Sequence, residues 1–286
     1  KLTAETPIIF ASKEQSLVGI LHESIQPSSI GVVIIVGGPQ TRVGSHRAFV
    51  ELARYLASNG VHVFRFDYTG AGDSGGEATS FIDVVEDIGA AVECFASRVN
   101  NLNSIGLWGL CDAASAIAIY LNESKCSPLV DRLVLLNPWV NQPHTQAKTY
   151  LKHYYLQRLM SREFWRKLFS GKVSLLTSAK EIHNFSKQSQ FEGQQNCMTK
   201  EYGTDNYVEY MASGLERFEG KLLFILAERD LVGQEFKALA AENSRWQDIL
   251  AKKHAEIATV RNANHTFAHR HWKEEVNNLS LMLILS

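Results

Sequence analysis

A cysteine lies at the centre of a run of small residues, Gly109-Leu110-Cys111-Asp112-Ala113, where an apolar segment gives way to a small-residue helix. Gly and Ala two positions either side of a nucleophile suit a sharp strand-to-helix turn, because larger side chains would collide there. The thiol would lie at the N-terminal end of the helix, where the dipole and unpaired backbone N–H groups favour negative charge. Cys111 is therefore predicted to be a catalytic nucleophile rather than a buried structural cysteine.

A nucleophilic thiol needs a base to take its proton and an acid to orient that base. In an open parallel sheet both should follow the C-terminal ends of strands and come after the nucleophile in the chain. Asp230 follows one apolar segment late in the sequence, and His265 follows the next. We therefore predict a Cys111–His265–Asp230 triad, with Glu228 as the rival acid.

Acyl transfer also needs N–H groups that hold an oxyanion. One should be the backbone N–H of Asp112, directly after the nucleophile. The second should come from the loop Gly37-Gly38-Pro39-Gln40, in which Pro39 has no N–H to donate. Gln40 is the predicted second donor, with Gly38 as the alternative.

Positive charge follows this loop at Arg42, His46 and Arg47. Guanidinium groups suit the recognition of carboxylate or phosphate, so these residues are candidate ligands for an anionic substrate. An arginine near the start of a helix can equally be structural, and the sequence does not decide between the two.

The elements that must position these residues alternate between strand and helix. Helical segments are expected from Ser45 to Leu56, over 80–98 and after Cys111, and an apolar tail at 279–285 is typical of the end of a packed helix. This alternation predicts a mostly parallel sheet of eight strands covered by helices on both faces. The expected strands cover 8–11, 17–22, 32–36, 61–66, 104–108, 132–136, 222–227 and 257–260.

The stretch from 143 to 215 breaks the alternation and is too long for an ordinary connection. It is interpreted as a helical cap inserted into a core domain formed by 1–142 and 216–286. Apolar residues recur there at helical spacing, and basic residues gather over 148–172. Three interpretations of the basic face stay open: a solvated surface, a funnel for anionic substrates, and a helix that contacts a membrane surface.

Composition excludes several classes of protein. The 286 residues carry a formal net charge of −1, which gives no sign of a nucleic-acid partner. Four cysteines without paired spacing indicate a reducing compartment, and Cys94, Cys126 and Cys197 are interpreted as structural. No apolar run approaches the roughly 20 residues of a membrane span, and no signal-peptide pattern opens the sequence. These features predict a cytoplasmic protein.

No cofactor or metal is predicted. The run Gly70-Ala71-Gly72-Asp73-Ser74-Gly75 has the spacing of a dinucleotide-binding loop, but such a site needs an acid at the end of the next strand, which here ends at Trp108. These glycines are expected to form a tight turn instead. The ten histidines show no paired ligand spacing with cysteines or acids.

The elbow, the segment Phe66-Asp67-Tyr68-Thr69-Gly70 and the loops of Asp230 and His265 resemble the α/β-hydrolase superfamily over nearly the whole chain. More narrowly, the loop at 37–47, the segment 108–115 and Leu136-Asn137-Pro138-Trp139-Val140 resemble the exosortase A system-associated hydrolases. Those bacterial proteins are encoded beside exopolysaccharide and protein-sorting machinery. The resemblance implies the α/β-hydrolase fold, the triad and a bacterial source, but no substrate. The Cys nucleophile and Pro39 depart from the pattern of the wider superfamily.

The sequence therefore predicts a hydrolase that acts on a small carboxylic ester or thioester through a covalent acyl-enzyme. Three alternatives remain open. An acyltransferase resembling polyester synthases would pass the acyl group to an alcohol, and a lactonase resembling dienelactone hydrolase would suit a small anionic substrate near Arg42 and Arg47. The third is a binding scaffold without turnover.

Overall fold

The computed structural model describes residues 4–123, 126–140, 206–252 and 255–286. These residues belong to one compact unit formed by 1–142 and 204–286. The predicted cap at 143–215 therefore lies outside the described residues, except for the last part, which belongs to a helix of this unit. The cap and its basic segment at 148–172 stay predictions.

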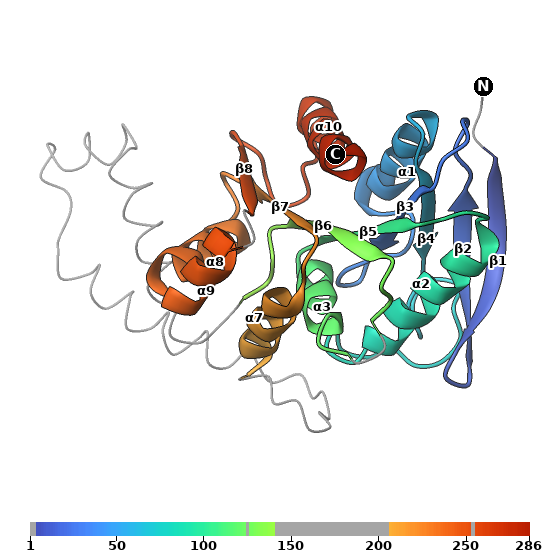
Figure 1. Cartoon of the computed structure of the whole chain (residues 1–286), viewed down its shortest axis with the longest axis horizontal. Helices are drawn as coiled ribbons and strands as arrows, with labels where there is room; N and C mark the ends of the chain where they lie inside the picture. Colours follow the sequence, from blue (N-terminus) through green and yellow to red (C-terminus); the bar gives the residue numbers. More distant parts are fainter. Residues whose placement is uncertain (1–3, 124–125, 141–205, 253–254) are drawn as a thin grey trace, which may run out of the picture. The chain divides into compact units, whose positions relative to one another are not determined.

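The described residues form one sheet of eight strands in the order β1-β2-β4-β3-β5-β6-β7-β8 (Figure 1). β1 pairs with β2 and β2 with β4 in antiparallel fashion, and every other pairing is parallel. The predicted eight-stranded, mostly parallel sheet is thus confirmed. The strands are β1 (Glu5–Ser12), β2 (Gln15–His22), β3 (Ile30–Ile35), β4 (His62–Phe66), β5 (Ser104–Leu110), β6 (Val130–Leu136), β7 (Lys221–Ala227) and β8 (Glu256–Val260).

Helices cover both faces of the sheet, as predicted. In Figure 1, α1 and α10 lie on one face, and α2, α3 and α7 lie on the other. α8 and α9 pack against each other beside β7 and α7. The helices are α1 (Ala48–Ser58), α2 (Val85–Arg98), α3 (Asp112–Tyr120), α7 (Tyr207–Arg217), α8 (Leu231–Glu242), α9 (Ser244–Lys252) and α10 (Arg270–Leu285), and a short 3-10 turn, η1 (Ser45–Arg47), precedes α1.

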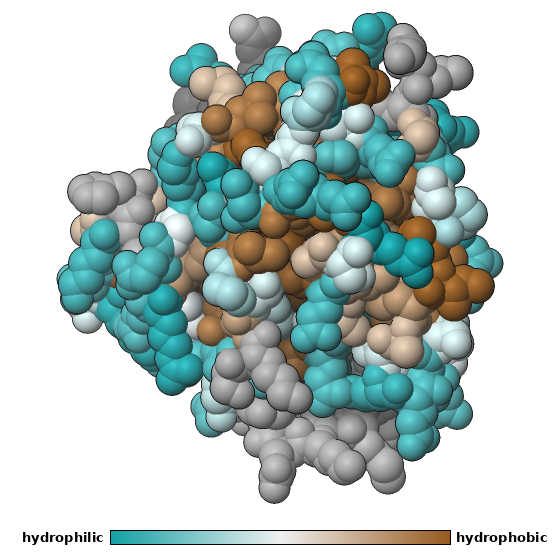
Figure 2. Space-filling model, turned by 45° about the vertical axis from the view of Figure 1, so that its right-hand side comes forward, coloured by the Kyte–Doolittle hydropathy of each residue, from teal (hydrophilic) through white to brown (hydrophobic). Residues whose placement is uncertain are grey.

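Burial of the strands follows their place in the sheet. All seven residues of the central strand β5 are buried, as expected of a parallel strand covered on both faces. The one polar side-chain group of Trp108 in this strand is hydrogen-bonded in the interior, because the indole N–H donates to Ser280 Oγ at 3.1 Å. At the edge strand β1, Ile9 is 71% exposed. Figure 2, turned toward that edge, shows apolar residues between hydrophilic ones on the surface.

Two helices begin later than the sequence suggested. α1 begins at Ala48 rather than Ser45, because the Ser45 N–H donates to the side chain of Gln40 and the next two residues have left-handed backbones, with φ of 50° at His46 and 60° at Arg47. α2 begins at Val85 rather than at residue 80. The apolar tail does end a packed helix, α10.

The sheet has a switch point between β3 and β5. After β3 the chain crosses through α1 to β4 on one side, and after β5 it crosses through α3 to β6 on the other. Neighbouring parallel strands whose connections diverge leave a crevice at their C-terminal ends, where α/β proteins bind ligands. The loop after β3 begins at Val36 and the turn after β5 is at Cys111, so both predicted parts of the site lie at the C-terminal ends of these two strands.

No helix in the described part of the chain is long and apolar enough to span a membrane.

Candidate active site

Cys111 forms a strained turn between β5 and α3. Its backbone has φ 63° and ψ −125°, a conformation that L residues rarely adopt and that costs about 1–3 kcal/mol. A Cβ placed on Gly109 would lie 2.7 Å from Ile117 Cδ1 and 3.0 Å from the backbone carbon of Ala113, so glycine favours the close approach of strand and helix. This is the geometry of a nucleophile elbow, which presents the central side chain at the crevice.

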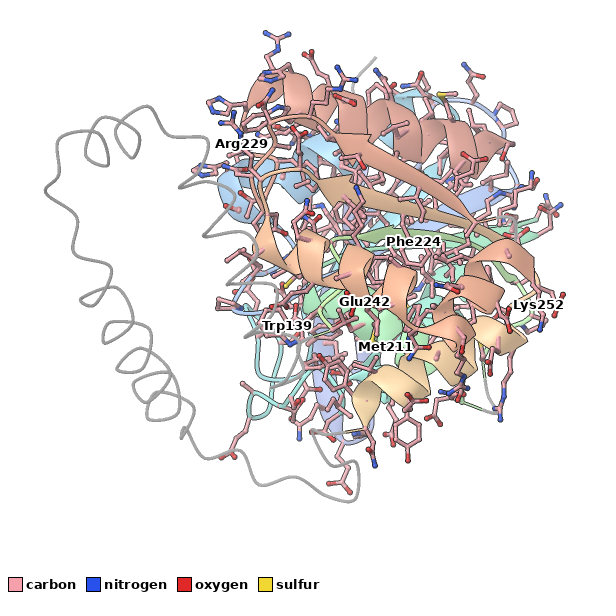
Figure 3. All side chains as sticks on the ribbon, turned by 90° about the vertical axis from the view of Figure 1, so that its left-hand side faces the viewer. Trp139, Met211, Phe224, Arg229, Glu242 and Lys252 are labelled. Carbon is pink, nitrogen blue, oxygen red and sulfur yellow. The ribbon has the colours of Figure 1, made fainter. Side chains whose placement is uncertain are left out.

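Hydrogen bonds from both sides hold the elbow. The Cys111 N–H donates to Leu136 O at the end of β6 (2.8 Å), and Cys111 O accepts from the N–H groups of Ala114 (3.0 Å) and Trp139 (3.3 Å). Trp139 O in turn accepts from Ser115 Oγ at 2.7 Å. Trp139 and Arg229 follow β6 and β7 and lie toward the same end of the sheet in Figure 3. The strained turn is therefore supported by both neighbouring elements.

His265 lies between the predicted acid and the predicted nucleophile. Its Nδ1 is 2.8 Å from Asp230 Oδ2, and its side chain also forms a hydrogen bond with Cys111. Asp230 is buried at the N-terminus of α8, where Oδ2 also accepts from the Gly233 N–H at 3.2 Å. The structure thus brings Cys111, His265 and Asp230 together in the order that a relay needs.

The surroundings of His265 favour its protonated form. The hydrogen bond with Asp230 is the largest cause, followed by the one with Cys111, and together with the two negative charges they outweigh burial and raise the pKa of His265 to about 10. At neutral pH the ring is therefore an imidazolium, with a proton to give to a leaving group.

Asn137 is a positioning residue that the sequence did not single out for a role. It directly follows β6, is fully buried and has a left-handed backbone with φ 40°. Its Oδ1 accepts from the Ala227 N–H (2.8 Å) at the end of β7, and its Nδ2 donates to the His265 carbonyl (3.1 Å). One amide thus joins the elements that carry the base and the acid. The sequence offers one signal, an Asn at the end of a buried strand.

The rival acid, Glu228, contacts a different group. Its Oε2 accepts from the Asn262 N–H at 2.7 Å, which ties β7 to the loop that carries His265. Glu235 on α8 is another buried carboxyl, and its pKa is raised by burial and by the charge of Asp230. Asp230 is therefore the carboxylate that meets the imidazole.

The loop after β3 meets the elbow through Gly38. The Gly38 N–H donates to Asp112 Oδ2 at 2.8 Å, whereas the Gln40 N–H donates to Gly37 O at 3.2 Å inside a turn. A Cβ on Gly37 would lie 2.3 Å from Asp112 Oδ1, so this close approach requires glycine. The geometry gives no support to Gln40 as an oxyanion donor. Of the two predicted loop donors, Gly38 faces the elbow.

The Asp112 carboxylate is incompletely paired. Burial raises its pKa, while hydrogen bonds from the backbone N–H groups of Gly38, Ala113 and Asp112 itself act in the opposite direction. Its Oδ1 is buried and has no hydrogen-bond partner among the described residues, and the same holds for the hydroxyl of Tyr68. The charge of Asp112 acts on that hydroxyl and, with burial as the larger cause, raises the pKa of Tyr68.

The predicted substrate-binding cations have different surroundings. The Arg42 side chain forms ion pairs with Asp67 and Asp73, and the Arg42 backbone N–H donates to Asp67 Oδ1 at 2.6 Å. Its charge is thus already neutralised by two carboxylates, which favours the structural interpretation. His46 and Arg47 are exposed in the turn before α1, and their roles as substrate ligands stay predictions.

The glycine-rich run after β4 folds around the Asp67 carboxylate. The Gly70 N–H donates to Gly75 O at 2.8 Å, and the Ser74 N–H donates to Ala71 O at 2.9 Å. A Cβ on Gly72, which has φ 55°, would lie 2.2 Å from Asp67 Oδ2. These glycines form a tight turn around Asp67.

The structure describes two further cysteines, Cys94 and Cys126. Burial is the largest cause that raises the pKa of both Cys94 and Cys126, which keeps their thiols protonated. Cys197 lies outside the described residues. In the described part of the chain, no group of three or more His, Cys, Asp or Glu side chains is placed to hold a metal ion.

The family described as "Serine aminopeptidase, S33" matches residues 27–269, which include the loop after β3, the turn at Cys111, Asp230 and His265. A comparison with curated protein sequences gives no significant match.

Solved structures share the fold at low sequence identity. The Pyrococcus furiosus esterase Pf2001 is 16% identical, with a TM-score of 0.63 over 99% of this chain and 90% of that one. A dienelactone hydrolase from Anabaena variabilis is 12% identical, with a TM-score of 0.61 over 100% and 98% of the two chains. Est1E from Butyrivibrio proteoclasticus, solved with ferulic acid bound, is 14% identical, with a TM-score of 0.60 over 98% and 100%. At these identities the likeness concerns the fold.

Proposed function

Because the chain belongs to the serine aminopeptidase S33 family of α/β-hydrolases, we propose that it hydrolyses small carboxylic esters or thioesters, with Cys111 as the nucleophile in place of the family's serine. The observation that supports this proposal is the position of Cys111 at the strained turn, hydrogen-bonded to a histidine that a buried aspartate holds. A structural cysteine has no need of either contact.

In the acylation step, the sulfur of Cys111 forms a bond to the carbonyl carbon, and the π electrons of the carbonyl move to its oxygen. Backbone N–H groups at the crevice stabilise this oxyanion. When the carbonyl re-forms, the bond to the alcohol or thiol breaks, and the leaving group takes the proton from the imidazolium of His265. The products of this step are a thioester on Cys111 and a free alcohol or thiol.

In the second step, neutral His265 takes a proton from water while the oxygen attacks the thioester carbon. Collapse of this second oxyanion breaks the carbon–sulfur bond and releases a carboxylic acid. Asp230 holds the ring by its Nδ1 in both steps, so that Nε2 faces the reacting groups. The thiolate and imidazolium are then restored.

The test is a rapid-mixing experiment with p-nitrophenyl acetate and an acetyl thioester. We expect wild type to release a burst of p-nitrophenolate equal to the enzyme concentration, and Cys111→Ala to release none. Cys126→Ala is the matched control, because it removes a half-buried thiol whose pKa burial raises. An unchanged burst in Cys111→Ala would overturn the assignment of the nucleophile.

Addition of an alcohol distinguishes hydrolysis from acyl transfer. A hydrolase should give free acetate whether or not a short-chain alcohol is present, whereas a transferase should give mainly the new ester. The interpretation as a scaffold predicts neither product from any member of an ester and thioester panel.

We also propose a bacterial exopolysaccharide setting, which the resemblance to the exosortase A system-associated hydrolases supports. The test is the content of ester-linked acyl groups in the exopolysaccharide of a deletion strain. An increase would support this setting, and an unchanged content would count against it.

A further inference from the structure

The backbone N–H groups predicted to hold the substrate's oxyanion already face an anion. The Gly38 N–H donates to Asp112 Oδ2 at 2.8 Å, and the nearby N–H groups of Asp112 and Ala113 also act to lower the pKa of this carboxyl group. The Asp112 N–H is the first oxyanion donor that the sequence predicts, and the Gly38 N–H is the loop donor that the geometry favours over Gln40. The carboxylate therefore lies where the substrate oxygen must become negative.

From this arrangement we propose that Asp112 is a resident anion in the oxyanion hole and must leave it before an acyl donor can react with Cys111. The proposal rests on the function proposed above. A carboxylate and a substrate oxyanion carry the same charge and need the same donors, so they cannot occupy the hole together. Asp112 thereby limits the rate of acylation without changing the protonation of the Cys111 thiol.

The Asp112 carboxylate is bound strongly enough to compete with a substrate oxyanion and weakly enough to dissociate from the hole. A charge-assisted hydrogen bond to a backbone N–H is stronger than a neutral one, which favours occupation of the hole. Oδ1, by contrast, is buried without a partner among the described residues, and its contact with Gly37 supplies no hydrogen bond. A buried oxygen without a hydrogen bond destabilises the conformation in which the Asp112 carboxylate occupies the oxyanion hole. Only a modest free-energy difference therefore separates this conformation from one in which the side chain has turned away from the hole.

The opposite role for the same contact is that of a clamp. If the bond from Gly38 to Asp112 served to hold the loop after β3 in its active position, loss of the carboxylate would disorder the oxyanion hole and slow acylation. The two roles therefore predict changes of opposite sign in the same experiment.

The experiment compares two reactions of the same thiol in the full-length protein. Alkylation by iodoacetamide needs the thiolate but no oxyanion hole, whereas acylation by p-nitrophenyl acetate needs both. The ratio of the acylation rate to the alkylation rate therefore reports on the hole and cancels changes in thiolate population. We expect Asp112→Ala to raise this ratio by about tenfold, well within the 10²–10³ that one oxyanion donor can contribute.

Asp112→Asn serves as the second variant, because it keeps the shape of the side chain and removes the charge, so its ratio should lie between wild type and Asp112→Ala. Asp248→Asn is the matched control for charge alone, since Asp248 is exposed on α9, and its ratio should equal that of wild type. Thermal unfolding of each variant checks that it is folded.

An unchanged or lower ratio in both Asp112 variants would overturn the proposal in favour of a clamp or of no role. Failure of the proposed function would look different: wild type and Asp112→Ala would both be alkylated at Cys111, and neither would be acylated.

Discussion

On one side of the elbow, the residues at the ends of β6, β7 and β8 leave few polar groups unsatisfied. Asn137, Asp230 and His265 form this acid–base side, and each takes part in at least two hydrogen bonds. On the other side lie Gly38 after β3 and Asp112 after the elbow, which form the oxyanion side. There the Asp112 carboxylate accepts a hydrogen bond from the Gly38 N–H, and its other oxygen is buried without a partner in the described part of the chain.

The difference indicates which part of the reaction is prepared before substrate arrives. Proton transfer requires the imidazole to be aligned and charged, and the acid–base side already provides both. Stabilisation of an oxyanion requires free donors, which the oxyanion side provides only after Asp112 moves. Substitutions on the two sides should therefore differ in their effects. Loss of a contact on the acid–base side should lower the acylation rate or the free energy of unfolding, whereas loss of one on the oxyanion side should leave these quantities unchanged or raise them.

The largest effect is expected from Asp230→Asn. Without the carboxylate, the imidazolium loses its main stabilising partner and the amide no longer fixes the tautomer of the ring, so acylation should fall by about 10²–10⁴-fold. Burst kinetics with p-nitrophenyl acetate measure this loss. Glu228→Gln is the matched control and should change the rate little, since Glu228 binds the Asn262 N–H rather than the imidazole. A larger loss in Glu228→Gln would reverse the assignment of the acid.

The pH dependence should change in the same variant. Because Asp230 and Cys111 raise the pKa of His265 to about 10, the wild-type acylation rate should fall as the pH rises through about 10. In Asp230→Asn this falling limb should move to lower pH. The free energy of unfolding should also fall at high pH. Protonation of His265 contributes fully to stability at pH values below the ordinary histidine pKa of 6.5, and this contribution is lost as the pH rises through about 10. A falling limb at the same pH in both proteins would contradict the contact.

A smaller loss is expected from Asn137→Ala. The change leaves the Ala227 N–H and the His265 carbonyl without their partner in the interior, which should lower the free energy of unfolding by about 2–4 kcal/mol. Acylation should fall as well, because the loop of His265 loses an anchor. Urea unfolding and burst kinetics measure the two effects. The matched control, Asn59→Ala, removes an exposed asparagine at the end of α1 and should cost under about 1 kcal/mol.

The smallest effect, and one of opposite sign, is expected from Tyr68→Phe near the oxyanion side. Its hydroxyl is buried without a partner among the described residues, so its removal should leave the free energy of unfolding unchanged or raise it by about 1 kcal/mol. Tyr55→Phe is the control, because the Tyr55 hydroxyl donates to Asn278 and its loss should destabilise by about 0.5–1.5 kcal/mol. If Tyr68→Phe destabilised as much as Asn137→Ala, the contrast between the two sides would fail.

Local patterns in the sequence were sufficient for the sheet. Continuous apolar segments such as Val32–Val36 can be satisfied only between two layers, and small residues around Cys111 permit one kind of turn. The meeting of Asp230 with His265 followed from parallel strands alone, because their C-terminal ends share one edge.

Hydrogen bonds made by individual side chains account for what the sequence missed. Ser45 looks like a helix cap, but its N–H binds Gln40 and the helix starts three residues later. The bridging role of Asn137 depends on a buried amide that reaches two loops far apart in the chain. The direction of the Asp112 side chain depends on the approach of Gly37 and Gly38, which no local pattern encodes.

The identity of the nucleophile can be tested most directly by acid-quenching the enzyme with p-nitrophenyl acetate and mapping the acetyl group on its peptides by mass spectrometry. We expect one acetyl group, as a hydroxylamine-sensitive thioester on Cys111. An acetyl group on any other residue, or equal turnover by Cys111→Ala, would contradict the assignment of the thiol as nucleophile.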